Sequence, residues 1–345
     1  MIFKYSKSSS HLEIENSQRR KLEKKTHQRQ QLSISKLLNY KKRTNCILCQ
    51  EKLKGSSFLH RNIPFIRCSK CSQIQTINNP PTNFPKNLEI EFGFENVYPK
   101  LTKKDFLSRV DRVYSPKLEW ILESLKELNY SDENIKSKFW LELGSGAGYF
   151  LSSLEKNNIR SFSGLEKNEA LVIESNSQLL GKHAILNHDT LTDSIKKNKA
   201  DIYVMFFVLE HMLDLKSFFY ELSKKPKGTI FIFSVPTFGF DTIIENVFDE
   251  YYSRHLDGVI HTQLFTEESI NYCLEFSGYS KKSEWVFGQD TDDLIRFINT
   301  SITGKYEDDF QNEISKKLKK INNQIQHVLD KNKFSDSRHI IAIKQ

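Results

Sequence analysis

The sequence lacks long apolar runs, and this absence excludes several classes of protein. The longest run, from Ile202 to Leu209, is far shorter than the roughly 20 residues that a transmembrane helix needs. Met1 to Ser10 also lacks the apolar core of a secretory signal. We therefore expect no membrane span and a cytoplasmic location.

Composition nevertheless supplies enough material for a folded core. The chain has 345 residues, of which 38% are hydrophobic and 27% are charged. This balance is typical of a globular protein and not of a disordered one. The length exceeds the usual size of one core, so we expect one catalytic domain and a smaller module.

Positive charge is concentrated at one end of the chain. The formal net charge is +8. Residues 1–43 contain twelve Lys or Arg against three Glu, so this segment carries +9 and the rest is close to neutral. A basic groove across the catalytic part is therefore not indicated. We expect a flexible or partly helical tail over 1–43, or alternatively a cationic arm that touches phosphate.

Four of the five cysteines form two C-x-x-C pairs. Cys46 and Cys49 are followed, after eighteen residues, by Cys68 and Cys71. Two such turns can direct four thiolates at one zinc ion, as in a zinc ribbon. We expect a closed, structural zinc site; a redox pair is the alternative, but neither motif is placed as in a thioredoxin-like site. Cys273 lies in an apolar helical stretch and is expected in the core.

Zinc-ribbon turns often have glycine directly after the second cysteine, where the backbone favours a positive φ. Gln50 and Ser72 occupy these two positions here. This departure concerns the geometry of the turns more than the identity of the ligands.

From Lys138 onward, buried strands alternate with helices. We expect strands at 138–143, 161–166, 183–187, 201–207 and 229–235. This alternation predicts an α/β, Rossmann-like, doubly wound sheet with helices on both faces. Ser337 to Lys344 resembles a closing antiparallel strand, giving a seven-stranded sheet.

A glycine-rich turn follows the first of these strands. Glu142 precedes Gly144, Ser145, Gly146 and Gly148, and these glycines allow a sharp turn and close approach of a ligand to the backbone. The G-x-G-x-G spacing differs from the G-x-G-x-x-G of dinucleotide binders. Glu166 ends the second strand, where a carboxylate can accept ribose hydroxyls.

These motifs resemble the class I S-adenosylmethionine-dependent methyltransferases over roughly residues 136–290. The matching stretches include Leu141 to Phe150, Gly164 to Glu166, Asp201 to Met212 and His261 to Thr266. The resemblance implies that Glu142 and the glycine loop hold the methionine part of S-adenosylmethionine, Glu166 the ribose and Asp189 the adenine. The cysteine module adds a resemblance to methyltransferases of bacterial sugar and surface-polysaccharide pathways.

Methyl transfer to a hydroxyl or carbon acid needs a base near the methyl group. The resemblance and the position both favour His261 as this base, with His211 and Tyr252 as alternatives. In that group an acid often precedes this histidine, but Ile260 stands there, so C-methylation, O-methylation and other acceptors stay open. Some metal-assisted O-methyltransferases have a carboxylate where this chain has Phe207; we expect Phe207 at the cofactor and no catalytic metal.

A long helix precedes the last strand. Apolar residues recur at helical spacing over this segment: Phe310, Ile314, Leu318, Ile321, Ile325 and Val328. Such a stripe packs on its own domain or pairs with a second subunit, so a homodimer through this helix is one expectation.

The expected organisation has four parts: a basic tail over 1–43, a zinc-ribbon-like module over 44–80, a helical lead-in over 86–135, and a methyltransferase domain over 136–345 with a helical insertion at about 290–333. The first functional hypothesis is methylation of a sugar, nucleotide sugar or related small metabolite. The second is methylation of rRNA or tRNA, with the zinc module and basic arm holding the nucleic acid. The third is a non-catalytic cofactor-binding or assembly protein.

Overall fold

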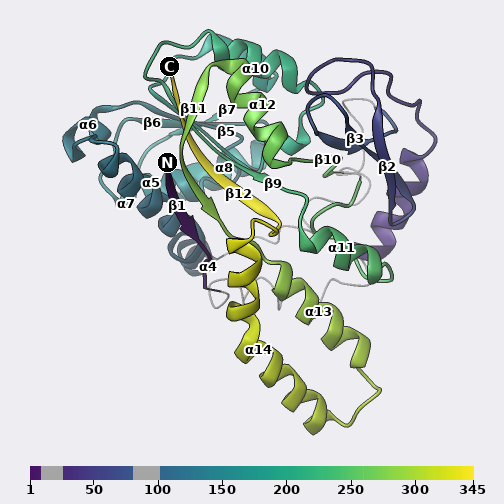
Figure 1. Cartoon of the computed structure of the whole chain (residues 1–345). Helices are drawn as coiled ribbons and strands as arrows, with labels where there is room; N and C mark the ends of the chain where they lie inside the picture. Colours follow the sequence, from purple (N-terminus) through teal and green to yellow (C-terminus); the bar gives the residue numbers. More distant parts are fainter. Residues whose placement is uncertain (9–25, 81–101, 259) are drawn as a thin grey trace.

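A computed structural model describes residues 1–8, 26–80, 102–258 and 260–345, and two sheets organise them (Figure 1). The larger sheet has eight strands in the order β1-β11-β12-β9-β8-β5-β6-β7. Its strands are β1 (Ile2–Tyr5), β5 (Trp140–Leu143), β6 (Phe162–Glu166), β7 (Ala184–Leu186), β8 (Ile202–Phe206), β9 (Ile230–Pro236), β11 (Tyr279–Val286) and β12 (Ser337–Lys344).

The direction of the strands confirms the predicted fold class. Strands β5 to β9 pair in parallel, whereas β12 runs antiparallel to both β9 and β11. The five strands predicted from 138 to 235 each begin and end within two residues of the observed ones. The chain therefore has the predicted α/β, Rossmann-like fold with an antiparallel last strand.

The sheet has one strand more than the seven predicted. Strand β1 pairs in parallel with β11, from Ile2 opposite Ser283 to Tyr5 opposite Val286. The expectation of a flexible or partly helical tail over 1–43 is therefore wrong for residues 2–5. Four residues are too short to show a reliable strand period, and the pairing depends on a sheet edge more than 270 residues away.

Helices cover both faces of the large sheet. One face packs on α5 (Ser115–Glu127), α7 (Tyr149–Lys156) and α8 (Glu169–Gln178). The other packs on α9 (Leu191–Lys197), α10 (Leu215–Ser223) and α12 (Glu267–Ser277). Alternate strand residues explain this division, because Trp140 points to the first face and Leu141 to the second. Within the described residues, no helix combines the length and apolarity needed to span a membrane.

The lead-in predicted over 86–135 is described from residue 102 onward; residues 86–101 lie outside the described part. It consists of α4 (Lys103–Arg109), a π-helical turn η2 (Val110–Tyr114), α5 and α6 (Asp132–Ser137). A capping box at Thr102 begins α4. Leu118, Trp120 and Ile121 are buried under the sheet, so this segment forms one wall of the catalytic core.

The cysteine module is built into a second, four-stranded antiparallel sheet. Its strands are β2 (Gly55–His60), β3 (Ile63–Cys68), β4 (Ile74–Thr76) and β10 (Gln263–Leu264), in the order β10-β4-β3-β2. Strand β10 comes from a much later part of the chain. The small sheet therefore joins the cysteine module directly to the segment that follows His261 (Figure 1).

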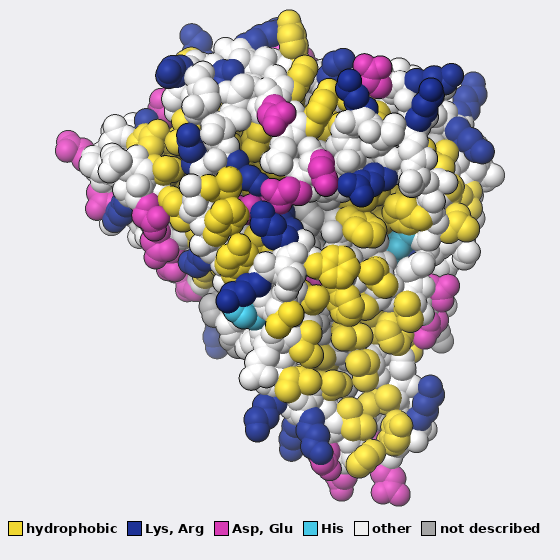
Figure 2. All heavy atoms as spheres, viewed as in Figure 1, with side chains coloured by type: hydrophobic (Ala, Val, Ile, Leu, Met, Phe, Trp, Pro, Cys, Tyr) yellow, Lys and Arg dark blue, Asp and Glu magenta, His cyan; other side chains and the backbone are white. Residues whose placement is uncertain are grey.

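Two helices, α13 (Asp290–Ile302) and α14 (Asp308–Lys331), project from the core as a hairpin (Figure 1). The residues of α14 that are buried are polar: Asn322, Gln326 and Asp330. Most of the predicted apolar stripe faces outward: Phe310 is 52% and Val328 59% exposed, whereas Ile314 and Leu318 are half-buried. Figure 2 shows hydrophobic side chains gathered over these two helices and the adjoining α11 (Phe240–Val247).

Candidate active site

The glycine loop forms the floor of the site at the carboxyl end of β5. Gly144, Gly146 and Gly148 all have positive φ, at 76°, 53° and 79°. A Cβ on Gly144 would lie 2.8 Å from Val208 Cγ2, and one on Gly148 would lie 1.9 Å from Ser175 Oγ. No atom lies within 4 Å of the corresponding position at Gly146. The first and third glycines thus serve packing, and the middle one leaves space for a ligand.

Glu166 fixes the shape of this loop from the end of β6. Its Oε2 accepts the N–H of Gly146 at 2.8 Å. Its Oε1 accepts the N–H groups of Lys167 and Asn168, each at 2.8 Å. A carboxylate has about four lone-pair sites, and these three N–H groups leave one of them on Oε2, so the group can also accept a hydroxyl of a ribose beside the loop.

Glu142 is the buried acid beneath the loop. Its side chain is 4% exposed, and its Oε2 has no hydrogen-bond partner among the described residues. Burial raises the pKa of Glu142 well above its ordinary value, Lys117 opposes this rise, and Glu166 adds to it. Ser145 Oγ is likewise buried without a described partner. Unsatisfied buried acceptors of this kind fit a ligand that brings N–H donors, such as the ammonium group of methionine.

Lys117 is a buried cation at the site that the sequence reasoning missed. It lies on α5 with only 4% exposed, and its Nζ is 4.7 Å from the ring centre of Phe206 and 5.0 Å from that of Phe207. A lone lysine in an amphipathic helix carries no sequence signal for such burial. Its charge influences Glu142 and Glu210, which places it between the glycine loop and the end of β8.

Phe207 directly follows β8 in an unusual backbone conformation. Its φ is 55°, a value that non-glycine residues rarely adopt, and its side chain is 37% exposed. Its ring meets that of His339 edge to face at 5.7 Å. Strained residues of this kind concentrate at binding sites, where the surrounding structure holds them.

Asp189 lies in the loop after β7. Its carboxylate forms an ion pair with Lys197 at 2.7 Å, and both side chains are well exposed. The adenine role that the sequence suggests for Asp189 stays a prediction.

Two of the three candidate bases lie together. The ring centres of His211 and His261 are 5.0 Å apart. His211 ends the 3-10 turn η3 (Leu209–His211) after β8, whereas His261 precedes β10. Nδ1 of His211 lies 3.1 Å from the carbonyl oxygen of Ile260, and Nδ1 of His261 lies 3.1 Å from that of His255.

Glu210 completes this group, which we call the Glu–His–His cluster: Glu210, His211 and His261. The Glu210 side chain is fully buried, and burial raises its pKa to about 8. Oε1 of Glu210 lies 4.0 Å from Nε2 of His211. Sequence reasoning selected the histidines and overlooked this acid, although it directly precedes His211.

Tyr252 lies in a different environment. Its ring packs under the Arg296 guanidinium, with 4.3 Å between the guanidinium carbon and the ring centre. Its carbonyl oxygen accepts a hydrogen bond from the same arginine at 3.3 Å. These contacts describe a packing role; a catalytic role for Tyr252 stays a prediction.

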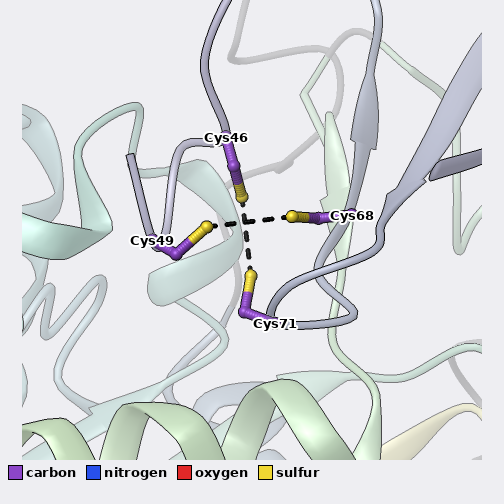
Figure 3. Close-up of side chains that lie close together, drawn as sticks. All are labelled: Cys46, Cys49, Cys68 and Cys71. Carbon is purple, nitrogen blue, oxygen red and sulfur yellow. Dashed lines mark hydrogen bonds between the residues drawn. The ribbon is translucent and has the colours of Figure 1, made fainter. Parts of the chain in front are cut away.

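The four cysteines converge as Figure 3 shows, with their sulfurs pointing to one centre. The Sγ atoms of Cys46 and Cys71 are 3.6 Å apart, and those of Cys49 and Cys68 are 3.8 Å apart. Four sulfurs about 2.3 Å from a tetrahedral zinc ion would be about 3.8 Å from one another. The observed spacing therefore fits such an ion. A hydrogen bond from Cys71 lowers the pKa of Cys46 to about 5.

Each C-x-x-C pair forms the same tight turn. Gln50 and Ser72, the two residues where glycine was expected, both have a φ of 60°. Their N–H groups donate to the carbonyl oxygens of Cys46 and Cys68, at 3.0 and 2.9 Å. The turns thus adopt the left-handed conformation without glycine.

A hydrogen-bonded chain links the cysteine module to the Glu–His–His cluster. Gln73, two residues after Cys71, donates to Oε1 of Gln263 at 2.9 Å. Nε2 of Gln263 in turn donates to the carbonyl oxygens of Leu209 and Met212, at 3.2 and 2.7 Å. The module therefore holds both sides of the turn that carries Glu210 and His211.

Comparison with known proteins agrees with this geometry. Residues 117–284 match the profile of a family described as a methyltransferase domain. The match spans the glycine loop, Glu166, Glu210 and both histidines. None of the curated proteins matches the sequence.

Several solved structures are similar to the chain at low sequence identity. Magnesium protoporphyrin IX methyltransferase from Synechocystis is 13% identical, with a TM-score of 0.44 over 73% of this chain and 93% of that one. Geranyl diphosphate C-methyltransferase from Streptomyces coelicolor is 12% identical, with a TM-score of 0.43 over 72% and 85%. A methyltransferase from Archaeoglobus fulgidus is 16% identical, with a TM-score of 0.43 over 74% and 99%. No substrate for this chain follows from such distant similarity.

Proposed function

We propose that the chain transfers a methyl group from S-adenosylmethionine to a hydroxyl or acidic carbon of a small, sugar-like acceptor. One observation carries the proposal: the glycine loop and its acids adjoin a pair of histidines. Val208 joins the two parts, since it contacts Gly144 and lies two residues before Glu210. S-adenosylmethionine, when bound, supplies a methyl group on an electrophilic sulfonium.

Different residues in and around the loop bind different parts of the cofactor. Glu142 and Ser145 face the methionine part with unsatisfied acceptors, and Lys117 supplies a positive charge for its carboxylate. Glu166 accepts the ribose hydroxyls, Asp189 serves the adenine, and Phe207 packs against the bound molecule. The bound cofactor would approach the backbone most closely at Gly146, where the space is open.

The acceptor loses its proton at the His211–His261 pair. A carbonyl oxygen only accepts hydrogen bonds, so Nδ1 of each histidine carries the hydrogen, and in the neutral form of the ring Nε2 has the lone pair that can accept a proton. His261 is the proposed base because its neighbours hold it firmly: its N–H donates to Asp257, and its ring is anchored to His255.

The cysteine cluster is proposed to hold one structural zinc ion. Four buried sulfurs at tetrahedral spacing leave no open position for a substrate. All five cysteines are free of disulfides, which agrees with work in a reducing compartment such as the cytoplasm.

A screen with a labelled methyl donor tests the proposal. Purified protein is incubated with labelled S-adenosylmethionine and panels of nucleotide sugars, free sugars and total RNA. Label in a sugar fraction is expected, and its loss in His261→Ala ties the transfer to this site. Label in RNA, with steep dependence on salt, would move the acceptor to nucleic acid. No S-adenosylmethionine binding by calorimetry would overturn the enzyme assignment altogether.

We also propose that a second copy of the chain covers the outer face of α14. Apolar residues recur there at alternating intervals of three and four residues: Ile314, Leu318, Ile321, Ile325 and Val328. This spacing is typical of a helix-pairing seam, and a neighbouring face of α14 is already buried against α13 through Asn322 and Gln326. The helix is 24 residues long, enough for about three heptads of contact.

Sedimentation of the native chain and of Ile321→Glu tests this pairing. A native dimer that Ile321→Glu converts to a monomer, with an unchanged unfolding temperature, is expected. Lys317→Glu is the control, because it introduces the same residue into the same helix at a position outside the seam. A native chain that sediments as a monomer would exclude the pairing.

A further inference from the structure

We propose that the Glu–His–His cluster is a site for a divalent transition-metal cation at the acceptor side of the methyltransferase. This inference rests on the proposed methyl transfer and changes one part of it: where Nε2 of His261 binds a cation, the acceptor proton leaves to solvent instead of to that histidine. It departs from the expectation of no catalytic metal, which considered only the residue at Phe207. The cluster is separate from the four cysteines and differs from them in the chemistry of its ligands.

The three side chains already converge. Each offers one ligand atom, and these atoms lie within 4.8 Å of one another. Cation–ligand distances of about 2.0–2.2 Å would place the ligand atoms roughly 3–3.5 Å apart, so only a small inward movement is needed. Glu210 and His211 are adjacent in η3, and His261 meets them from the segment before β10.

The carboxylate of Glu210 is the strongest indication of a missing partner. Its side chain is completely buried, and neither oxygen has a hydrogen-bond partner among the described residues. A buried carboxylate without partners is costly, and native structures provide hydrogen bonds or a cation for such groups. A bound cation would satisfy both oxygens at once.

The histidines are held in the form that binds metals. Their Nδ1 atoms donate to the carbonyl oxygens of Ile260 and His255, as described above. This pattern fixes the orientation of each ring and turns Nε2, the nitrogen that makes no bond to a carbonyl oxygen, into the atom available to a cation. Metal-ligating histidines are commonly oriented by just such a hydrogen bond to a carbonyl or carboxylate.

The surroundings are built as a rigid support. Gln263 holds the carbonyl oxygens on either side of Glu210 and His211, and Asp257 accepts the N–H groups of Ile260 and His261. The His211 side chain is 38% exposed, so the cluster is reachable from solvent. Three protein ligands with an accessible side leave coordination positions for an acceptor.

The ligand set indicates the class of cation. Two imidazoles and one carboxylate suit Zn²⁺, Fe²⁺, Co²⁺ or Mn²⁺, whereas the four thiolates of the cysteine cluster suit Zn²⁺. A cation here would coordinate the acceptor oxygen and lower the pKa of its hydroxyl. The oxygen lone pair would then attack the methyl carbon, and the sulfonium sulfur would leave as a thioether. The proton leaves to solvent, and the methyl group forms a bond to oxygen as its bond to sulfur breaks.

Manganese titration of the full chain tests the site, because Mn²⁺ favours oxygen and nitrogen ligands over thiolates. The electron paramagnetic resonance signal of free Mn²⁺ is followed as protein is added. We expect one saturable Mn²⁺ per chain, with zinc at the cysteines retained. Glu210→Gln and His261→Gln should each raise the Kd at least tenfold, while Glu313→Gln, on the exposed surface of α14, should leave it unchanged.

The outcomes separate this site from the proposed function. Circular dichroism first confirms that each variant keeps the native fold. No Mn²⁺ uptake, together with methyl transfer that His261→Gln abolishes, would reject the cation site and leave histidine as the base. Equal Mn²⁺ affinity in all variants would also overturn the site. Specific Mn²⁺ binding without any methyl transfer would keep the cation site and reject the proposed function.

Discussion

The cysteine cluster and the Glu–His–His cluster are assembled in different ways. Each cysteine pair is positioned by one local turn, so the ligands show in the sequence as C-x-x-C. In the second cluster, His261 lies fifty residues after His211, and Glu210 belongs to an unremarkable Leu-Glu-His turn. The cysteine cluster can be predicted from the sequence because local turns form it, whereas the Glu–His–His cluster depends on how the large sheet and β10 meet.

The largest effect should come from breaking the locally encoded site. Cys68→Ser removes one of four sulfurs, and structural zinc contributes roughly 10–16 kcal/mol in small zinc peptides. We expect loss of zinc, unfolding of the four-stranded sheet and loss of turnover, because Gln263 of β10 supports η3. Elemental analysis and thermal unfolding provide the measurements.

Cys273→Ala is the matched control for that change, since Cys273 is a buried thiol of α12 outside the cluster. It should retain one zinc per chain. If Cys68→Ser also retained zinc and native stability, the four-thiolate assignment would be wrong.

His261→Ala breaks the cluster that tertiary structure assembles. Removing a group that takes up the acceptor proton typically lowers turnover by about 10²–10⁴-fold. Cofactor affinity should stay nearly constant, because the glycine loop and Glu166 are intact. Steady-state kinetics and calorimetry measure the two quantities. His183→Ala changes a half-buried histidine whose ring centre lies 4.2 Å from that of Phe162, and this variant should keep its turnover. Equal turnover in both variants would shift the role to His211 or Tyr252.

Glu166→Gln tests a residue of the cofactor loop that the sequence motif predicts and that the structure also places at the loop, on the N–H of Gly146. The amide keeps the shape of the side chain but loses the charge that accepts ribose hydroxyls. A hydrogen bond to a charged group is worth about 1.5–3 kcal/mol, so S-adenosylmethionine affinity should fall about 10- to 100-fold. Calorimetry measures it, with exposed Glu169→Gln on α8 as the control. Unchanged affinity would refute the role given to Glu166.

The smallest effect concerns a third polar cluster, around Asp290 at the start of α13. Its carboxylate accepts the N–H groups of Asp241 and Asp336 and a hydrogen bond from Gln326. Burial, and then the charge of Asp336, raises the pKa of Asp290 from 3.8 to about 8. Between these two values the folded state keeps a proton that the unfolded state has lost. The contribution of protonated Asp290 to the free energy of unfolding therefore declines as pH rises from 3.8 towards 8.

Asp290→Asn cannot lose this proton. The unfolding temperature of the variant should thus improve relative to the native chain between pH 5 and pH 8, by a few degrees. Differential scanning calorimetry at both pH values measures the change. Asp292→Asn, on the same helix turn, controls for the loss of a helix-start charge. A constant difference between variant and native chain would show that Asp290 is ionised throughout.

Most of the large sheet could be predicted because its signals are periodic and local. Runs such as Ile202–Phe206 are apolar throughout, as is typical of parallel strands that are buried on both faces. The seven-strand count failed at Ile2–Tyr5, whose pairing with β11 is a matter of tertiary contact. The burial of Lys117 and the outward face of α14 were equally invisible, because a helix pattern does not state what covers which face.

By itself, the sequence determined the fold class, the cysteine pairs and the glycine loop with its acids, since turn geometry and strand period act over a few residues. Only the tertiary structure joined His211 to His261, exposed the unsatisfied Glu210 beside them, and tied both to the cysteine module through Gln263. Contacts between distant segments depend on the packing of the whole sheet, and no short stretch of sequence contains that information.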